Sequence, residues 1–421
     1  MTKTEAYENS YVFMGLTPKY GYKASKLYCY KPTDGTGDFQ WSRSNVAYRV
    51  NQSGLLESMG NNVPRIDHMN GCPELLIEEE RTNLLLYSDK YDESPEWLFY
   101  GVDSITGGQS DPYGTTTAFR ITDEAINDTH YIYQNIVTAS TDLVGTVMAK
   151  AGTLDYIYLD LFDKDGVNHR TWFNLTDGTI GTNADGNTAW ISPRTINGYW
   201  VCSVYNSLNF LGGGGSFIVG LAESDGIATY NGNNNYVDLG GADLQVGLFP
   251  TSHILTTSST ATRLQDTNNN TVNFTGEGFS YNLRVRIENR NDASVPDYLL
   301  FFADTSGVPD NYIGLYVLDN NLEFVFFNSP DTEVVRTAIT DGIHNIGFSF
   351  NGVSGAYQVV LDGVSVLSGT IASAFTTVGT YDKCLIGCLD NQIYSPALNR
   401  VIGLQIFDSI LLSADLINIT S

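Results

Sequence analysis

The sequence lacks long apolar runs, and this absence excludes integral membrane proteins of the helical type. None of its 421 residues belongs to a stretch that approaches the about 18 consecutive apolar residues of a membrane-spanning helix. The N-terminal residues "MTKTEAYENSYVFMG" also lack the apolar centre of a secretory signal peptide. We therefore expect no membrane insertion and no cleaved leader.

Positive charge is scarce. The chain has 22 Lys and Arg against 47 Asp and Glu, which gives a formal net charge of −25. An acidic surface repels phosphate backbones and anionic lipid headgroups, so we expect no nucleic-acid partner. Solubility is the simplest explanation of the acidity.

Cysteine frameworks and metal-binding motifs are missing as well. The five cysteines are odd in number and scattered, unlike those of a disulfide scaffold. Cys384 and Cys388 lie in one expected strand, which would place them roughly 13 Å apart, too far for a bridge. The five histidines have no HExxH or CxxC companions. The sequence therefore predicts no cofactor.

Alternation of period two recurs along most of the chain, whereas helical periodicity is nearly absent. In residues 156–162, three aliphatic side chains share one face, and the other carries Tyr156, Tyr158 and Asp160. Gly, Asn and Asp clusters between such segments are typical of turns. The pattern predicts an all-β protein.

The expected strands fall into two series, separated near Arg263. In the second series we expect tight turns at residues 319–320 and 362–363. Only the last residues look helical, with Ser413 as N-cap. The first eighty residues have few long apolar runs, and we expect an extended arm that packs on a neighbour.

Three pieces of this arm resemble a segment of phage virion proteins, especially tail-fibre-like proteins and adhesins. They are "GDFQWSRSNVAYRVNQSGLLE", "NNVPRID" and "LLIEEERTNLLLYS". In that family the segment leads into a jelly roll similar to carbohydrate-binding modules, which opens with a tryptophan, as Trp97 does here. The jelly roll ends with a motif similar to residues 236–263. Gly240 stands where the family usually has Trp, and His253 where it usually has Tyr.

The chain from about Asp266 is similar to concanavalin-A-like, laminin-G-type sandwiches, through "HNIGFSFNG", "YQVVLDGVSV" and "GLQIFDSILLSADLI". The resemblances imply an arm (1–82), a carbohydrate-binding-module-like jelly roll (83–265) and a second sandwich (266–421). Laminin-G-type domains often bind calcium through loop acids. The loop acids of the second sandwich that we consider for calcium are Asp304, Asp319 and Asp390.

A glycan site needs flat aromatic rings together with amides and carboxylates. Two expected strands of the jelly roll carry such residues on one face: Tyr156, Tyr158, Asp160, Arg170, Trp172 and Asn174. The competing interpretation places Trp172 in the sandwich core and the tyrosines under a protein interface, because aromatic residues in β proteins are usually packing residues.

Catalysis is not expected. Sandwich glycosidases present two acids across a cleft, roughly 5 to 9 Å apart. No strand here places alternate acids on one face, and the acidic run at residues 78–80 lies in the arm motif. The sequence predicts a protein without enzyme activity.

The resemblance implies a virion fibre, spike or adhesin subunit that binds host-surface glycans. It further implies that the arm binds other virion proteins, that the subunits form a homo-oligomer, with a trimer favoured, and that the protein reaches the virion surface after assembly in the host cytoplasm. The alternatives are a structural decoration or connector subunit without a ligand and, third, a secreted glycan-active enzyme.

Overall fold

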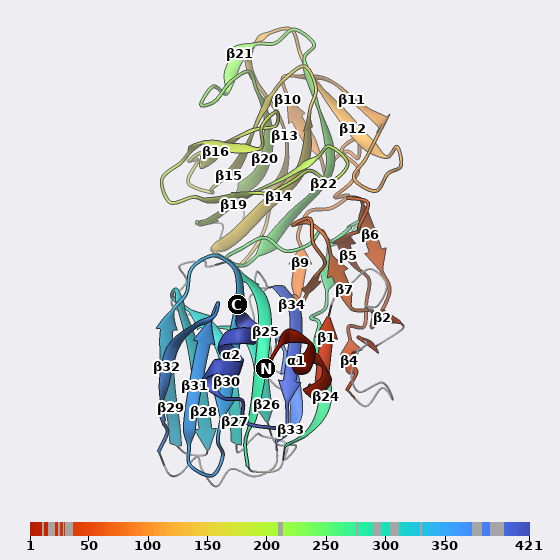
Figure 1. The fold of residues 1–421 in the computed structure, drawn as a ribbon. Helices are drawn as coiled ribbons and strands as arrows, with labels where there is room; N and C mark the ends of the chain where they lie inside the picture. Colours follow the sequence, from red (N-terminus) through yellow and green to blue (C-terminus); the bar gives the residue numbers. More distant parts are fainter. Residues whose placement is uncertain are drawn as a thin grey trace.

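The computed structural model describes residues 1–10, 12–15, 22–23, 26–27, 29, 37–208, 214–274, 277–288, 296–303, 311–328, 331–372, 381–387 and 400–421. The strands form two β-sandwiches, one above the other in Figure 1. The middle of the chain forms the first sandwich, and segments from both ends of the chain form the second. The predicted all-β class with two sandwiches is confirmed.

The first sandwich consists of two antiparallel sheets around an apolar core. Sheet I has the strand order β10 (Leu98–Tyr100), β13 (Asn127–Ile136), β20 (Gly215–Ala222), β15 (Tyr156–Phe162), β16 (Arg170–Asn174), β17 (Thr179–Asn183), with β21 (Thr229–Asn231) on β13. Sheet II has the order β11 (Val102–Gln109), β12 (Ala118–Asp123), β22 (Tyr236–Val246), β14 (Asp142–Ala151), β19 (Trp200–Ser207), β18 (Thr188–Ile191). In addition, β9 (Arg81–Asn83) pairs with β22, and β23 (Ala261–Arg263) pairs with β9. The core contains Ile157, Leu159 and Leu161, so the aliphatic face predicted for this strand is confirmed.

The second sandwich also has two antiparallel sheets. Sheet III has the order β32 (Val364–Thr370), β31 (Ala356–Leu361), β30 (Gly342–Phe350), β25 (Phe279–Ile287), β34 (Arg400–Phe407), β8 (Glu74–Leu76), β7 (Arg65–Asp67), with β1 (Val12–Gly15) on β34. Sheet IV has the order β2 (Tyr22–Lys23), β3 (Lys26–Leu27), β4 (Phe39–Ser42), β24 (Thr267–Phe274), β33 (Tyr381–Ile386), β26 (Asp297–Ala303), β27 (Asn311–Leu318), β28 (Asn321–Asn328), β29 (Asp331–Ala338). A separate hairpin consists of β5 (Ala47–Val50) and β6 (Leu56–Met59).

Both tight turns predicted in the second sandwich are present. Asp319 and Asn320 join β27 to β28 with φ of 48° and 60°, and Asp362 and Gly363 join β31 to β32 with φ of 49° and 77°. Positive φ at both central residues is the geometry of a two-residue turn whose twist matches the flanking strands.

The arm is part of the second sandwich of its own chain. Strand β1 pairs with β34, and β4 pairs with β24, so N-terminal strands extend both sheets. Phe39 and Trp41 lie in the same apolar core as the C-terminal strands. The predicted arm thus packs on a neighbour, and that neighbour belongs to the same chain.

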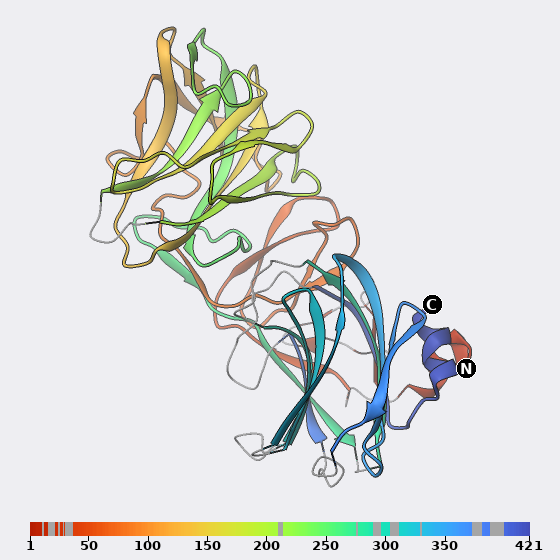
Figure 2. The ribbon, with the colours of Figure 1, turned by 90° about the vertical axis from the view of Figure 1, so that its left-hand side faces the viewer.

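Two short helices lie on the outer side of sheet III (Figure 2): α1 (Lys3–Asn9) and α2 (Ser413–Thr420). The prediction of Ser413 as N-cap is wrong by one residue. Leu412 is the N-cap, in extended conformation and without a side-chain hydrogen bond, and Ser413 is already helical. No helix in the described ranges is long and apolar enough to cross a membrane.

Candidate functional site: an aromatic face on the first sandwich

The outer face of sheet I carries a group of aromatic rings, here named the aromatic face. Strand register brings the rings together, because Tyr131, Gly220, Tyr158 and Trp172 are successive cross-strand partners on β13, β20, β15 and β16. Directly opposed residues of antiparallel strands point to the same side of the sheet. The rings of Tyr158 and Trp172, with centroids 5.6 Å apart, belong to an apolar cluster separate from the core. Trp172 is thus a buried packing residue, as the competing interpretation proposed, but it lies in this outer cluster and not in the core between the two sheets.

All the residues predicted for a glycan site lie on the aromatic face, but at two depths. Tyr158 and Asp160 are fully buried, and Trp172 is 8% exposed. The other three are half-buried: Tyr156, Arg170 and Asn174. We refer to the three buried residues, Tyr158, Asp160 and Trp172, as the floor of the aromatic face. Only the half-buried residues can contact a large ligand directly. Their role in ligand binding stays a prediction.

Three further tyrosines on this face were not predicted. Tyr131 and Tyr133 on β13 are half-buried and pack against the same cluster. Tyr100 on β10 is 47% exposed and stacks on Tyr131, with centroids 5.6 Å apart and ring planes at 25°. The alternation in "HYIYQ" shows that two of them share a face. It does not show how β13 is placed relative to β15 in the sheet, so the sequence alone does not bring these tyrosines to the face of Tyr158.

The charges of the aromatic face are paired. The Arg170 guanidinium lies with Nε 2.9 Å from Oδ2 of Asp160, and its Cζ is 5.0 Å from the ring centroid of Tyr158. The carboxylate also accepts a 2.7 Å hydrogen bond from the backbone N–H of His169. Burial raises the pKa of Asp160, while this hydrogen bond and the guanidinium oppose the shift.

Two polar atoms of the floor have no hydrogen-bond partner: the Tyr158 hydroxyl and the Trp172 indole nitrogen. Most buried polar groups in proteins are hydrogen-bonded to protein or to ordered water. Both atoms are buried, so they lie beneath the surface of the aromatic face.

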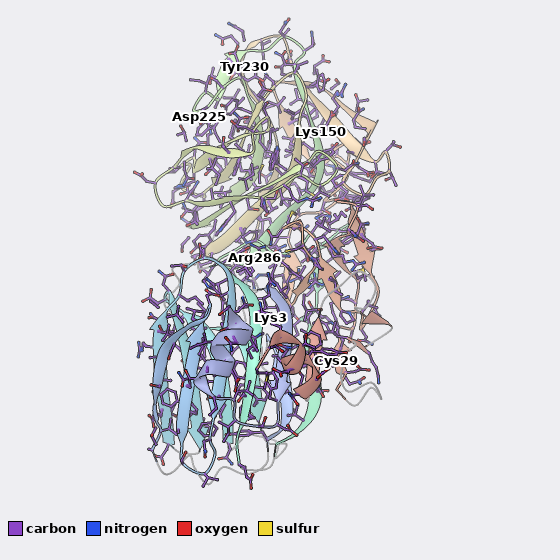
Figure 3. The ribbon with its side chains drawn as sticks, viewed as in Figure 1. Lys3, Cys29, Lys150, Asp225, Tyr230 and Arg286 are labelled. Atoms are coloured by element: carbon purple, nitrogen blue, oxygen red, sulfur yellow. The ribbon has the colours of Figure 1, made fainter. Side chains whose placement is uncertain are left out.

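A loop of residues 223–231 covers one end of the aromatic face. Asp225 accepts hydrogen bonds from the backbone N–H and hydroxyl of Thr182, at 2.6 and 3.0 Å. Ala228 packs on the floor, and β21 pairs with β13. Asp225 and Tyr230 mark this loop in Figure 3. Because both its ends are fastened to sheet I, the loop gives the face a fixed boundary.

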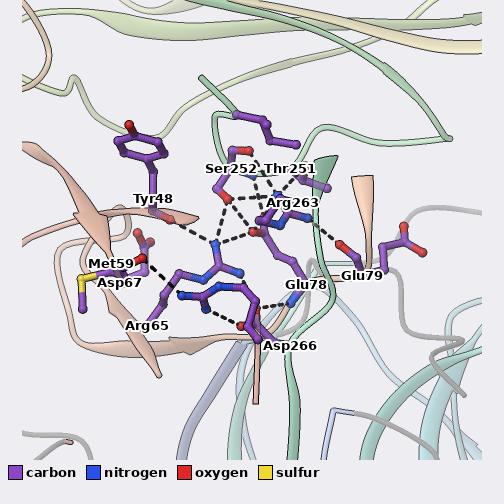
Figure 4. Close-up of polar contacts among 12 residues, drawn as sticks. Tyr48, Met59, Arg65, Asp67, Glu78, Glu79, Thr251, Ser252, Arg263 and Asp266 are labelled. Atoms are coloured by element: carbon purple, nitrogen blue, oxygen red, sulfur yellow. Dashed lines mark hydrogen bonds and ion pairs between the residues drawn. The ribbon is translucent and has the colours of Figure 1, made fainter. Parts of the chain in front are cut away.

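A second polar cluster lies between the sandwiches (Figure 4). The guanidinium of Arg65 contacts the carboxylates of both Glu78 and Asp266. Arg43 lies 2.6 Å from Asp266, and Arg263 lies 3.1 Å from Glu78. All five side chains are buried, and we refer to them as the junction network. Its acids are neutralised by arginines, which fits a structural role rather than a catalytic pair.

The two departures from the phage motif have structural explanations. His253 lies between two carboxylates, with Nδ1 2.7 Å from Asp243 and Nε2 2.9 Å from Asp89. Burial alone would lower the pKa of His253, but the carboxylates raise it well above its ordinary value. A β-carbon on Gly240 would lie 2.7 Å from Cγ of Pro112, so a tryptophan has no room there.

A cavity of about 200 Å³ lies beside this histidine, between sheet II, the β5–β6 hairpin and the segment after β22. Met148 and Val201 give it an apolar wall. The charged side chains in its lining include Arg400, whose guanidinium contacts Asp67.

Metal ligands are not grouped in the part of the chain that the structure describes: no three or more His, Cys, Asp or Glu side chains there could hold an ion. Of the acids considered for calcium, Asp304 and Asp390 lie outside the described residues, and Asp319 lies in the β27–β28 turn. Cys388 also lies outside them, and the four described cysteines are free thiols.

No protein-family model matches the chain, and no curated protein matches it. Among solved structures, a carbohydrate-binding domain of Ruminococcus gnavus (IT-sialidase CBM40) is 13% identical over 35% of this chain and 84% of that one, with a TM-score of 0.30. A SAP-like pentraxin from Limulus polyphemus is 16% identical over 34% of this chain and 70% of that one, with a TM-score of 0.29. The binding domain of botulinum neurotoxin DC is 15% identical over 37% of this chain and 39% of that one, with a TM-score of 0.30. These similarities are too low to assign a function.

Proposed function

We propose that this chain is a glycan-binding subunit of a phage fibre or spike. The observation that carries the binding function is the aromatic face. Accessible rings of Tyr100, Tyr131 and Tyr133 lie beside a floor with two unpartnered polar atoms. Aromatic rings stack on the apolar faces of sugars, and nearby polar groups bind sugar hydroxyls.

The virion part of the proposal rests on the resemblance of residues 38–88 and 236–263 to phage fibre and adhesin proteins. Such a subunit would be assembled in the host cytoplasm, join other virion proteins and be displayed on the virion surface. A homo-oligomer, with a trimer favoured, would let several weak sites bind one cell surface, since linked sites raise avidity well above a single affinity.

The test of glycan binding is an array of host-surface glycans probed with the full chain and two variants. Tyr131→Ala removes a ring of the aromatic face and should weaken binding about five- to tenfold, the equivalent of the about 1 kcal/mol of one aromatic contact. The matched control is Phe99→Ala, because Phe99 is 58% exposed on β10 but pairs with Ile132 and points away from the face. Equal binding by both variants would contradict a role of the face.

A structural connector without a ligand is the second candidate, and the junction network favours it. Its buried ion pairs fasten the arm to the segment that leaves the first sandwich, which suits a rigid spacer. If the subunit is a connector, particles that carry Tyr131→Ala should bind host cells as well as unaltered particles do. Only particles that lack the subunit should fail to bind. Release of reducing sugars from host polysaccharide would instead support the third candidate, an enzyme.

A further inference from the structure

The charges of the aromatic face restrict the kind of glycan that it can hold. Within sheet I, the described side chains on this face include one cation, Arg170. Its Nε binds Asp160, and its Nη2 donates a 2.9 Å hydrogen bond to the side-chain oxygen of Asn168. The guanidinium is therefore already neutralised and oriented by its own chain.

The edges of the face add negative charge. The Asp128 carboxylate accepts a 2.8 Å hydrogen bond from the Tyr100 hydroxyl, beside the exposed end of the tyrosine stack. In the loop of residues 223–231, whose Tyr230 pairs with Asp128, Glu223 and Asp225 are both exposed. An anionic sugar would approach these carboxylates without gaining a free cation.

Neutral hydrogen-bonding groups, in contrast, are numerous on the face. Among the described residues, no hydrogen bond involves the hydroxyls of the half-buried Tyr131 and Tyr133, and the Tyr158 hydroxyl is buried without a partner. The Asn174 amide nitrogen donates to the Tyr156 hydroxyl at 3.0 Å, and the amide oxygen accepts a 2.8 Å hydrogen bond from the backbone N–H of Thr176. The second amide hydrogen of Asn174 remains for a ligand. Such groups exchange hydrogen bonds with sugar hydroxyls, which are also uncharged.

We propose that the aromatic face binds neutral oligosaccharides and rejects those that carry carboxylate, sulfate or phosphate groups. This proposal rests on the proposed glycan-binding function and adds the class of glycan. Specificity of this kind comes from repulsion of the wrong ligand as much as from attraction of the right one.

The test compares lactose-terminated glycans with the same glycans carrying a terminal sialic acid or a sulfate, using the full chain at 20 and 150 mM salt. We expect the neutral probe to bind about tenfold or more tightly at low salt, and the difference to shrink at high salt as charges are screened. Asp225→Asn should reduce the difference in affinity between the neutral and the acidic probes, because it should strengthen the binding of the acidic probes only. Phe99→Ala serves as the control for surface changes.

Each outcome separates the two proposals. Binding of the acidic probes as tightly as the neutral one, with sensitivity to Tyr131→Ala, would overturn the neutral-glycan inference and leave glycan binding standing. Binding of no probe, across an array of neutral and acidic glycans, would overturn both. Glycan affinity that is unchanged by Tyr131→Ala would show that the binding site lies outside the aromatic face, and it would overturn the inference about this face.

Discussion

The ring of Tyr158 lies flat on Gly220, in the space that a β-carbon on the glycine would occupy. This contact places the floor of the aromatic face directly on the backbone of β20. Gly220 does not have a positive φ, so its backbone conformation is open to any residue. Only the packing of the Tyr158 ring requires a glycine at this position. The glycine is therefore a packing requirement.

Gly220→Ala should destabilise the first sandwich by about 1–3 kcal/mol, because the added methyl group overpacks the floor. The same substitution in a Tyr158→Ala background should cost clearly less, since the ring is gone. Urea unfolding of the four proteins measures this coupling. Equal costs in both backgrounds would show that the ring moves aside freely.

Arg65→Met should destabilise the protein by about 3–5 kcal/mol, because it leaves the carboxylates of Glu78 and Asp266 buried with fewer partners. Lys90→Met is the control. Lys90 pairs with Glu93, their side chains are 56% and 32% exposed, and an exposed pair of this kind contributes little to the free energy of unfolding. Chemical denaturation measures the free energy of unfolding of both variants. A similar decrease in both would mean that the junction network contributes no more to stability than an exposed ion pair.

Acid should weaken the junction network through Glu78. Burial alone would raise the pKa of Glu78, but Arg263 and Arg65 lower it well below its ordinary value. A depressed folded pKa gives stability that is present above the ordinary pKa of about 4.3 and is lost as pH falls toward the folded value. The free energy of unfolding should therefore decrease between pH 5 and pH 3, and this slope should be smaller in Glu78→Gln. An unchanged slope would exclude this carboxylate as the source.

Alkaline pH should also destabilise the protein, through His253. Because its folded pKa is raised, its contribution is fully present below the ordinary pKa of about 6.5 and is lost as pH rises through the folded value. His253→Gln should remove this loss, whereas His169→Gln, at a half-buried position, should retain it. Melting temperatures from pH 6 to pH 10 test the difference. The same alkaline decrease in all three proteins would assign it to other groups.

Local patterns in the sequence predicted local structure well. The alternation at residues 156–162 identified both faces of β15, and the residue types at 319–320 predicted a tight turn, which the structure has with positive φ at both residues. Helix α1 was missed, although Thr2 and Glu5 form a capping box, a pattern visible in "TKTE". These features depend on a few neighbouring residues, so a single sequence contains them.

Long-range pairing was not predictable in the same way. Tyr131 and Tyr133 belong to the candidate site only because β20 lies between β13 and β15, and no short segment encodes that order. His253 was recognised as a departure from the phage motif. One of its carboxylate partners, Asp89, comes from a segment far away in the sequence, so the role of His253 became visible only in the folded chain.

The backbone N–H of Asp266 donates a 2.9 Å hydrogen bond to the carbonyl of Glu78, and the N–H of Glu78 donates at 3.1 Å to the Asp266 carboxylate. The chain thus leaves the second sandwich and returns to it at one point, with the whole first sandwich in between. In terms of modular design, the first sandwich is an insert whose two ends touch, the arrangement in which domain insertion is best tolerated. We therefore expect that the first sandwich can be exchanged for another domain at Glu78 and Asp266 while the strand order of the second sandwich is preserved.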